Sequence, residues 1–139
     1  MKTLALLALL VGAPATAAET HVVEMFNRSG NGPMIYEPSF LRIAPGDSVR
    51  FVPTQPSHNA STIDGMIPEG AESFRSKINE DFTVTLTVPG SYGVKCSPHV
   101  AMGMVMLIEV GEGAETVLPD DLPARAKERF EAILAARPE

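Results

Sequence analysis

One ten-residue run, Lys95 to Met104, holds the chain's only cysteine, Cys96, with a histidine and a methionine close behind it. A thiolate, an imidazole and a thioether on one short loop are soft ligands that suit copper better than zinc, calcium or magnesium. Two histidines and one cysteine in a trigonal arrangement, with a weak axial methionine, form an electron-transfer copper site. A further histidine upstream completes such a set. The candidate ligands are therefore His58, Cys96, His99 and Met104.

Two residues beside these ligands can tune such a site. Asn59 follows His58, so its backbone N–H or its side chain can donate a hydrogen bond to the copper thiolate. Pro98 has no N–H, so one donor that another residue would aim at the sulfur is absent. Hydrogen bonds to the sulfur adjust the reduction potential of such sites. We therefore expect Pro98→Ala to change the potential without removing copper.

The elements that must position the ligands are short strands. From His21 to Val110, apolar and polar residues alternate between Gly, Pro and Asn turns, which is typical of a β-sandwich. Phe82–Val88 is the clearest half-buried strand, and Val105–Val110 reads as a central one. Residues 59–80 show no clean period and predict a long surface connection with at most a helical turn. Cys96 then ends one strand and Met104 begins the next, and a Greek-key arrangement can bring His58 to them.

The C-terminal residues predict a helix. Asp121 can cap a helix whose first residues are Leu122 and Pro123, since proline is tolerated there. Apolar residues then fall on one helical face: Leu122, Ala126, Phe130, Ile133 and Leu134. A stripe this narrow favours a helix packed on the sandwich over one that binds a partner.

The first residues predict export. One positive charge, a short apolar stretch and small residues make a secretory signal peptide, with cleavage after Ala17 or Ala18. We expect a mature periplasmic protein with no membrane segment. We divide the chain into a signal peptide (1–18), a copper-binding sandwich (19–110) and a helical extension packed on the same domain (111–139). If cleavage follows Ala18, His21 becomes the third residue of an N-terminal Cu(II) site; cleavage after Ala17, which fits better, leaves it a surface histidine.

Composition excludes other classes of function. The net charge is −6, which disfavours nucleic-acid binding because that binding relies on cationic contacts to phosphates. A lone cysteine cannot form an internal disulfide, and in an oxidising compartment it is a liability or a ligand.

Several other interpretations of the cysteine fit less well. A small buried hydrophobe among core methionines does not explain the spacing to two histidines. A Cys–His nucleophile needs an orienting group and an oxyanion hole, and would leave Met104 without a role. Structural zinc normally takes four Cys or His ligands. A copper-delivery protein remains the alternative function, although the exchange of copper as cargo needs an open coordination position. A copper enzyme is a weaker hypothesis still, because Met104 takes the position that a substrate would need.

From about Val22 to Ala135 the chain resembles the pseudoazurins, small periplasmic blue copper proteins of the cupredoxin fold. The ligand loop alone does not separate it from plastocyanin, whose ligand spacing is similar, whereas amicyanin has a shorter loop. The helical extension and the segment Ile67–Gly70 favour pseudoazurin. The matching segments are Glu37-Pro38, Pro45-Gly46-Asp47, His58-Asn59, Met66–Glu72, Lys77–Glu80, Lys95–His99 and Met102–Met104.

The resemblance implies an all-β fold, an eight-stranded Greek-key sandwich followed by helices, although the first helix, between Gly111 and Pro119, looks shortened. It implies one type 1 copper per monomer on the four candidate ligands, with Met34 near the ring of the exposed histidine. It implies an electron carrier, not an enzyme, that serves a reductase of denitrification, commonly nitrite reductase. A cytochrome or a quinol-oxidising complex would be the donor.

The electron would leave through the edge of His99, framed by apolar residues that form a transient docking patch. The family often surrounds this patch with lysines, whereas this chain has Pro56 and Val100 where a lysine and an aromatic residue often occur. Four cations can still steer a partner. The expected patch consists of Met102, Val100, Ala101, Lys95, Lys77, Arg75 and Arg28.

Overall fold

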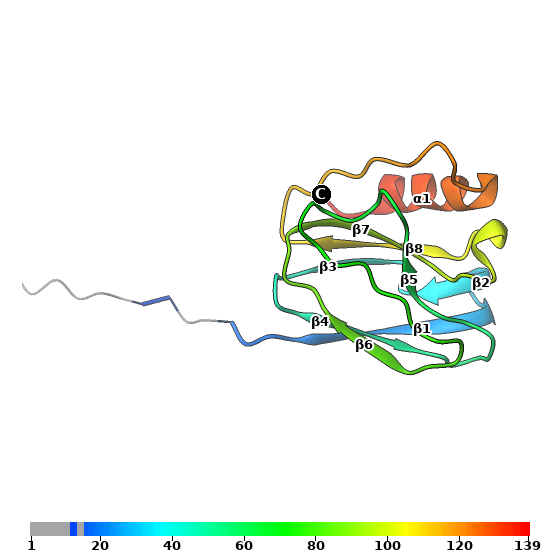
Figure 1. The fold of residues 1–139 in the computed structure, drawn as a ribbon, viewed down its shortest axis with the longest axis horizontal. Coiled ribbons are helices and arrows are strands. Elements are labelled where there is room, and N and C mark those ends of the chain that lie inside the picture. Colours follow the sequence, from blue (N-terminus) through cyan, green and yellow to red (C-terminus); the bar gives the residue numbers. More distant parts are fainter. Residues whose placement is uncertain (1–11, 14–15) are drawn as a thin grey trace, which may run out of the picture.

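The computed structural model describes residues 12–13 and 16–139, so most of the predicted signal peptide lies outside the described residues. Two four-stranded sheets pack face to face, and one helix covers the outside of the second sheet (Figure 1). The elements are β1 (Thr20–Ser29), β2 (Gly32–Glu37), β3 (Phe40–Ile43), β4 (Ser48–Val52), β5 (Ser61–Thr62), β6 (Phe82–Thr85), β7 (Gly90–Lys95), the 3-10 turn η1 (Val100–Met102), β8 (Val105–Val110) and α1 (Ala124–Ala136). The predicted β-sandwich with a C-terminal helix is confirmed.

The order of the first sheet is β2-β1-β4-β6, and that of the second is β3-β8-β7-β5. In each sheet one inner strand has a parallel and an antiparallel neighbour: β1 between β4 and β2, and β8 between β3 and β7. All six residues of β8 are buried, because the sandwich covers one face and α1 the other. The prediction that Val105–Val110 is a central strand is therefore confirmed.

Two apolar clusters hold these layers together. The main cluster lies between the sheets and includes Tyr36, Phe51 and Tyr92, together with Cys96 and Met104. The second cluster joins the outer face of β8 to α1 and includes Leu107 and Phe130. The cysteine and the methionine of the ligand loop thus belong to the core, which fixes them as firmly as any packed side chain.

The connection over residues 59–80 differs from the prediction of a surface segment. Residues 58–63 are buried, β5 pairs with β7, and Ser61 bridges Arg75. The segment folds back on itself: the backbone N–H of Ala60 donates to Ser76 Oγ (2.9 Å) and that of Thr62 donates to the Phe74 carbonyl (3.0 Å). These bonds satisfy the buried backbone, which alternation alone does not reveal.

The ends of two elements also differ from the prediction. The helix begins at Ala124 rather than at Leu122, because a residue before proline is disfavoured in the helical region and Pro123 itself is extended. The strand predicted over Phe82–Val88 ends at Thr85, although Leu86 still exchanges backbone hydrogen bonds with the Gly46–Asp47 turn. Within the described part of the chain, residues 111–123 form no helix.

Candidate metal centre

Three ligand atoms from two distant segments point at one another inside the sandwich. Cys96 Sγ lies 3.7 Å from His58 Nδ1 and 3.5 Å from His99 Nδ1, and the two Nδ1 atoms are 3.1 Å apart. A point equidistant from the corners of such a triangle is about 2 Å from each, the length of a metal–imidazole bond. The three atoms therefore fit a single small metal ion.

His58 lies in the loop between β4 and β5, and its backbone is held from outside the site. The backbone N–H of Asn79 donates to the His58 carbonyl at 2.8 Å, while Asn79 Oδ1 accepts the N–H of Ser57 at 2.6 Å. Ser57 and Asn79 both have positive φ angles (81° and 64°), a conformation that costs free energy unless the surroundings enforce it. The two residues thus clamp the loop that carries the upstream ligand.

The other ligands lie on one closed loop after β7. The backbone N–H of Cys96 donates to the Met104 carbonyl (3.0 Å), and the N–H of Met104 donates to the His99 carbonyl (3.2 Å). The N–H of Met102 also donates to the His99 carbonyl (2.9 Å). Met104 therefore lies at the base of the loop, next to the cysteine in space although eight residues away in sequence.

Asn59 ties the two segments together. Its Oδ1 accepts the backbone N–H of Ser97 (2.7 Å), and its Nδ2 donates to Ser97 Oγ (3.1 Å) and to the Ser76 carbonyl (3.2 Å). Its own carbonyl accepts the buried hydroxyl of Tyr36 at 2.7 Å. The side chain of Asn59 holds the loop, and it is the backbone N–H of Asn59 that acts to lower the pKa of Cys96.

The environment favours uncharged imidazole and a bound thiolate. Burial and the neighbouring His99 lower the pKa of His58, so His58 is neutral and can act as a ligand at neutral pH. Burial raises the pKa of Cys96, while the backbone N–H groups of Asn59 and His99 act in the opposite direction. A buried cysteine beside two imidazole rings is a donor set that suits a soft cation.

Exposure separates the four candidate ligands. His58, Cys96 and Met104 are completely buried, whereas His99 is partly exposed. The thioether and thiolate thus lie in the apolar core, and one imidazole edge reaches the surface.

Comparisons with known proteins agree with this geometry. Residues 23–111 match the family model of copper binding proteins of the plastocyanin/azurin family. The chain is 52% identical over 130 residues to a pseudoazurin of Paracoccus pantotrophus, covering 91% of this chain and 89% of that protein. It is 45% identical over 131 residues to a putative pseudoazurin of Rhizobium leguminosarum bv. viciae, covering 92% and 86%. A solved pseudoazurin structure from Sinorhizobium superposes with a TM-score of 0.80 at 45% identity, covering 84% of this chain and 94% of that one.

The chain belongs to the pseudoazurin family. It therefore has the cupredoxin fold and a type 1 copper site on His58, Cys96, His99 and Met104, and it is a small electron carrier rather than an enzyme. Bound copper supplies one-electron redox chemistry. The protein's part is to hold the ligands in place by the loop bonds described above.

The residues expected around this pseudoazurin site differ in their exposure. Pro98, Ala101 and Met102 are exposed, with 49% of Met102 accessible. Val100 turns the other way and packs into the cluster beneath α1. Met34, on β2, is partly buried against the core cluster that contains Cys96 and Met104. The four cations of the expected patch are exposed except for the half-buried Lys95: Arg28, Arg75, Lys77 and Lys95.

Sequence reasoning missed two arginines beside the ligand loop. Arg125 and Arg129, one turn apart on α1, line a surface hollow together with Met102 and Glu128. The sequence signal for this pair is their spacing of four residues, which places both side chains on the same face of the predicted helix. Nothing in the sequence indicated that this end of the helix lies beside the ligand loop.

A second histidine cluster forms at the start of β1. His21 Nε2 lies 2.9 Å from Asp47 Oδ2, and Glu19 Oε2 lies 4.0 Å from the same nitrogen. Asp47 also accepts the backbone N–H groups of Glu19 (2.9 Å) and Ala44 (3.1 Å). His21 is therefore not a free surface histidine but one partner of a carboxylate that ties β1 to the turn before β4.

Proposed function

We propose that this protein is a periplasmic carrier that delivers single electrons to a reductase of denitrification, with nitrite reductase as the acceptor. The observation that supports this most directly is that His99 is the one partly exposed ligand of the copper site. The predicted signal peptide supports the compartment. Among the described residues, no helix has the length and apolar character needed to cross a membrane.

The surface around His99 suits brief contact with a partner. Pro98, Ala101 and Met102 are exposed apolar residues that flank His99 in the sequence. Arg75 and Lys77 are exposed cations on the segment whose Asn79 N–H donates to the His58 carbonyl. Small redox interfaces bury under about 1,200 Å² and release quickly, which a carrier that turns over repeatedly requires. The cations steer an acidic partner toward the apolar area. A cytochrome or a quinol-oxidising complex is the proposed donor.

The residues have separate roles in this function. His58 and Cys96 hold their donor atoms inside the core, so the site keeps its shape when the charge on it changes. Met104 occupies the buried side and prevents a substrate from binding there. His99 both binds the metal and presents its ring edge to the partner.

The test mixes the reduced, copper-loaded mature protein with purified copper nitrite reductase and follows its oxidation by stopped flow. We expect rapid oxidation, and we expect the rate to fall about tenfold when Met102→Glu places a negative charge on the apolar area. Val117→Glu, a matched change at an exposed apolar residue outside the predicted patch, should leave the rate unchanged. Equal rates for both variants would contradict the docking site.

The same preparation tests the alternative, copper delivery. A carrier keeps its copper in the presence of a moderate chelator and shows reversible one-electron voltammetry. Copper that is pale and rapidly removed by the chelator would favour delivery instead, because cargo must leave through an open position.

A further inference from the structure

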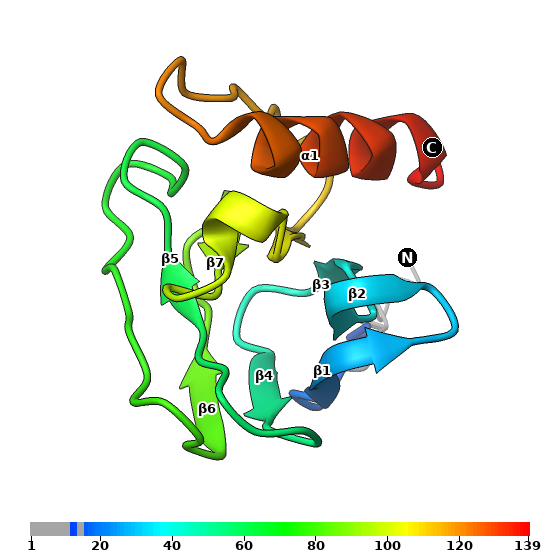
Figure 2. The same ribbon diagram turned by 90° about the vertical axis from the view of Figure 1, so that its right-hand side faces the viewer.

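The C-terminal helix lies directly behind the copper loop. Figure 2 shows η1 beneath the first turns of α1, and Figure 1 shows the same pairing from the side. Val100 of η1 packs into the cluster that contains Ala126 and Phe130 of the helix. The segment between the ligands His99 and Met104 therefore rests on α1.

The approach is closest at Gly103. Its φ is +90°, and a Cβ added there would lie 3.1 Å from the backbone carbonyl oxygen of Arg125. A glycine both permits this left-handed turn and lets the helix backbone approach the loop. Gly103 immediately precedes the ligand Met104, so a shift of the helix would be transmitted to the ligand through one peptide unit.

Arg129 links the same helix to β2 of the first sheet. Its Nη1 donates to the Met34 carbonyl at 3.3 Å, and burial lowers the pKa of the guanidinium. Within the described part of the chain, no carboxylate forms an ion pair with Arg129. Met34 has a positive φ of 47°, and its side chain packs on the cluster that holds Cys96 and Met104. A partly desolvated cation thus holds a carbonyl of a strained residue beside the core of the site.

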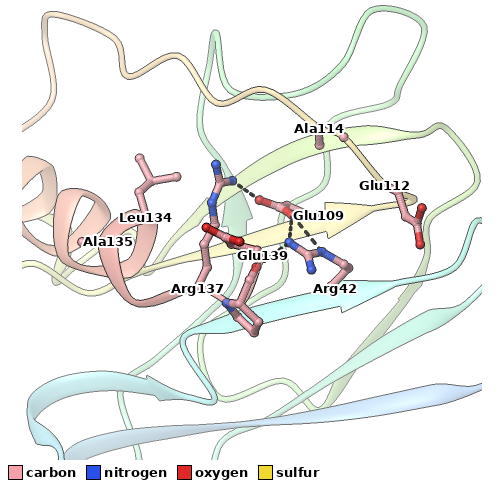
Figure 3. Close-up of a pocket in the computed structure, with 10 residues that line it drawn as sticks. Arg42, Glu109, Glu112, Ala114, Leu134, Ala135, Arg137 and Glu139 are labelled. Carbon is pink, nitrogen blue, oxygen red and sulfur yellow. Dashed lines mark hydrogen bonds and ion pairs between the residues drawn. The ribbon is translucent and has the colours of Figure 1, made fainter.

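The far end of the helix is fixed by charge. Glu109 of β8, whose side chain is only 2% exposed, accepts Arg42 Nε (3.1 Å) and Nη2 (3.0 Å) at Oε2, and Arg137 at Oε1. Figure 3 shows the two arginines converging on this carboxylate from β3 and from the end of α1. Arg42 also donates to the Pro138 carbonyl (3.0 Å). Because β8 begins immediately after Met104, both ends of α1 are tied to elements that carry or flank ligands.

We propose that α1 is a brace for the copper site and that Arg129 is its positioning residue. It joins the helix that supports the ligand loop to Met34 of β2, whose side chain packs on the core cluster containing Cys96 and Met104. This goes beyond electron delivery: the extension holds the ligand cage in shape before the metal enters and in both oxidation states. It rests on the copper site itself and not on which reductase is the partner.

The experiment compares Arg129→Met with Arg125→Met. Both remove one guanidinium from the same helix, but Arg125 is exposed and has no side-chain hydrogen bond in the described structure. Hydrogen exchange of the Cys96 and Met104 amides, which bond within the ligand loop, is measured in the copper-free protein. We expect the amides to exchange about tenfold faster in Arg129→Met, because this variant loses a hydrogen bond from a charged donor and the loop opens more readily. We expect no change in Arg125→Met.

Two further readouts separate bracing from simple loss of stability. In the copper-loaded protein, Arg129→Met should shift the visible thiolate-to-copper bands and the reduction potential, whereas Arg125→Met should not. Arg129→Lys, which keeps a shorter donor, should lie between Arg129→Met and the wild type, and it replaces Arg129→Met if that variant does not fold. Exchange rates and spectra that are the same in the Arg129 and Arg125 variants would overturn the proposal. This outcome is independent of stopped-flow rates with nitrite reductase.

Discussion

The copper cluster (His58, Cys96 and His99) and the Asp47 cluster (Glu19, His21 and Asp47) both contain histidine but differ in their other donor atoms and in what satisfies them. At the copper site, the sulfur and two Nδ1 atoms face one another across 3.1–3.7 Å, and no charged side chain among the described residues forms an ion pair with them. At the start of β1, Asp47 already accepts His21 and two backbone N–H groups. The start of β1 and η1 lie at opposite ends of the sandwich (Figure 1). One cluster is completed by a metal, and the other is complete as protein.

Burial strengthens this contrast. The sulfur and His58 lie in the core, where burying a charge without a partner costs free energy. The electrostatic attraction between these ligands and a bound ion is therefore little screened by water. Glu19 is exposed and His21 half-exposed, so water competes for both. Three ligand-type residues within reach of one another are thus insufficient for a metal site; their donor atoms must also be left without protein partners.

The largest expected effect comes from removing the thiolate. Cys96→Ser should abolish the intense blue band and weaken copper binding by orders of magnitude, because an alcohol is a poor ligand for a soft metal. Visible spectra and copper titrations of the refolded protein measure both effects. His21→Ala is the matched control from the other cluster and should retain the full colour and one copper per chain. Loss of copper in His21→Ala would show that the two clusters are not separate in function.

The next effect concerns stability rather than copper. Asp47→Ala removes the acceptor of three hydrogen bonds and leaves the N–H groups of Glu19 and Ala44 without it. We expect the melting temperature of the copper-free protein to fall by several degrees, with the visible spectrum of the loaded protein unchanged. Asp47→Asn, which keeps one acceptor oxygen, should lose less. An altered spectrum in Asp47→Ala would mean that the far end of the sandwich influences the copper site.

Asp47 also predicts a pH dependence of folding stability. The Glu19 backbone N–H, followed by His21 and the Ala44 N–H, lowers the pKa of Asp47 in the folded protein. A carboxyl whose folded pKa is lowered stabilises the protein above its unfolded value, about 3.9, and this stability is lost as the pH falls through the folded pKa.

The measurement compares the melting temperatures of the copper-free wild type and Asp47→Asn between pH 3 and 7. Their difference should be constant near neutral pH and shrink below about pH 4. Asp81 also has a lowered pKa, from its exposed pair with Arg50. Asp81→Asn is therefore the matched control, because it neutralises a carboxylate that also has a lowered pKa but lies outside the Asp47 cluster. A difference that does not vary with pH would exclude the Asp47 contribution.

Residue chemistry identified the copper cluster but not the Asp47 cluster. The ligand set follows from types and spacing, since few metals other than copper suit cysteine, two histidines and methionine together. The sandwich and its C-terminal helix follow from hydrophobic periodicity. The sequence suggests for His21 an N-terminal Cu(II) site or a surface position, but not the pairing with Asp47, because that partner is 26 residues away and lies in an ordinary turn motif.

Local pattern also failed where tertiary contacts decide the structure. The segment after Asn59 is buried although it lacks periodicity, because Ser76 and Phe74 supply its hydrogen bonds from further along the chain. The position of Arg129 beside Met34 depends on how α1 packs on the second sheet, over a sequence separation of 95 residues. Such contacts join residues that no local window contains together.

The smallest effect tests how the protein's own hydrogen bonds tune the copper cluster. The backbone N–H groups of Asn59 and His99 act to lower the pKa of Cys96, the His99 N–H donates to the Cys96 carbonyl (3.1 Å), and Pro98 has no N–H to donate. Pro98→Ala introduces an N–H beside the thiolate, which favours the reduced site because more negative charge resides on the sulfur there. A hydrogen bond of about 1 kcal/mol corresponds to a rise of roughly 40 mV for a one-electron couple. Voltammetry of the copper-loaded variant measures the shift. An unchanged potential with intact colour would mean that the new N–H does not reach the sulfur, and that the donor atoms of the copper cluster stay without a further protein partner.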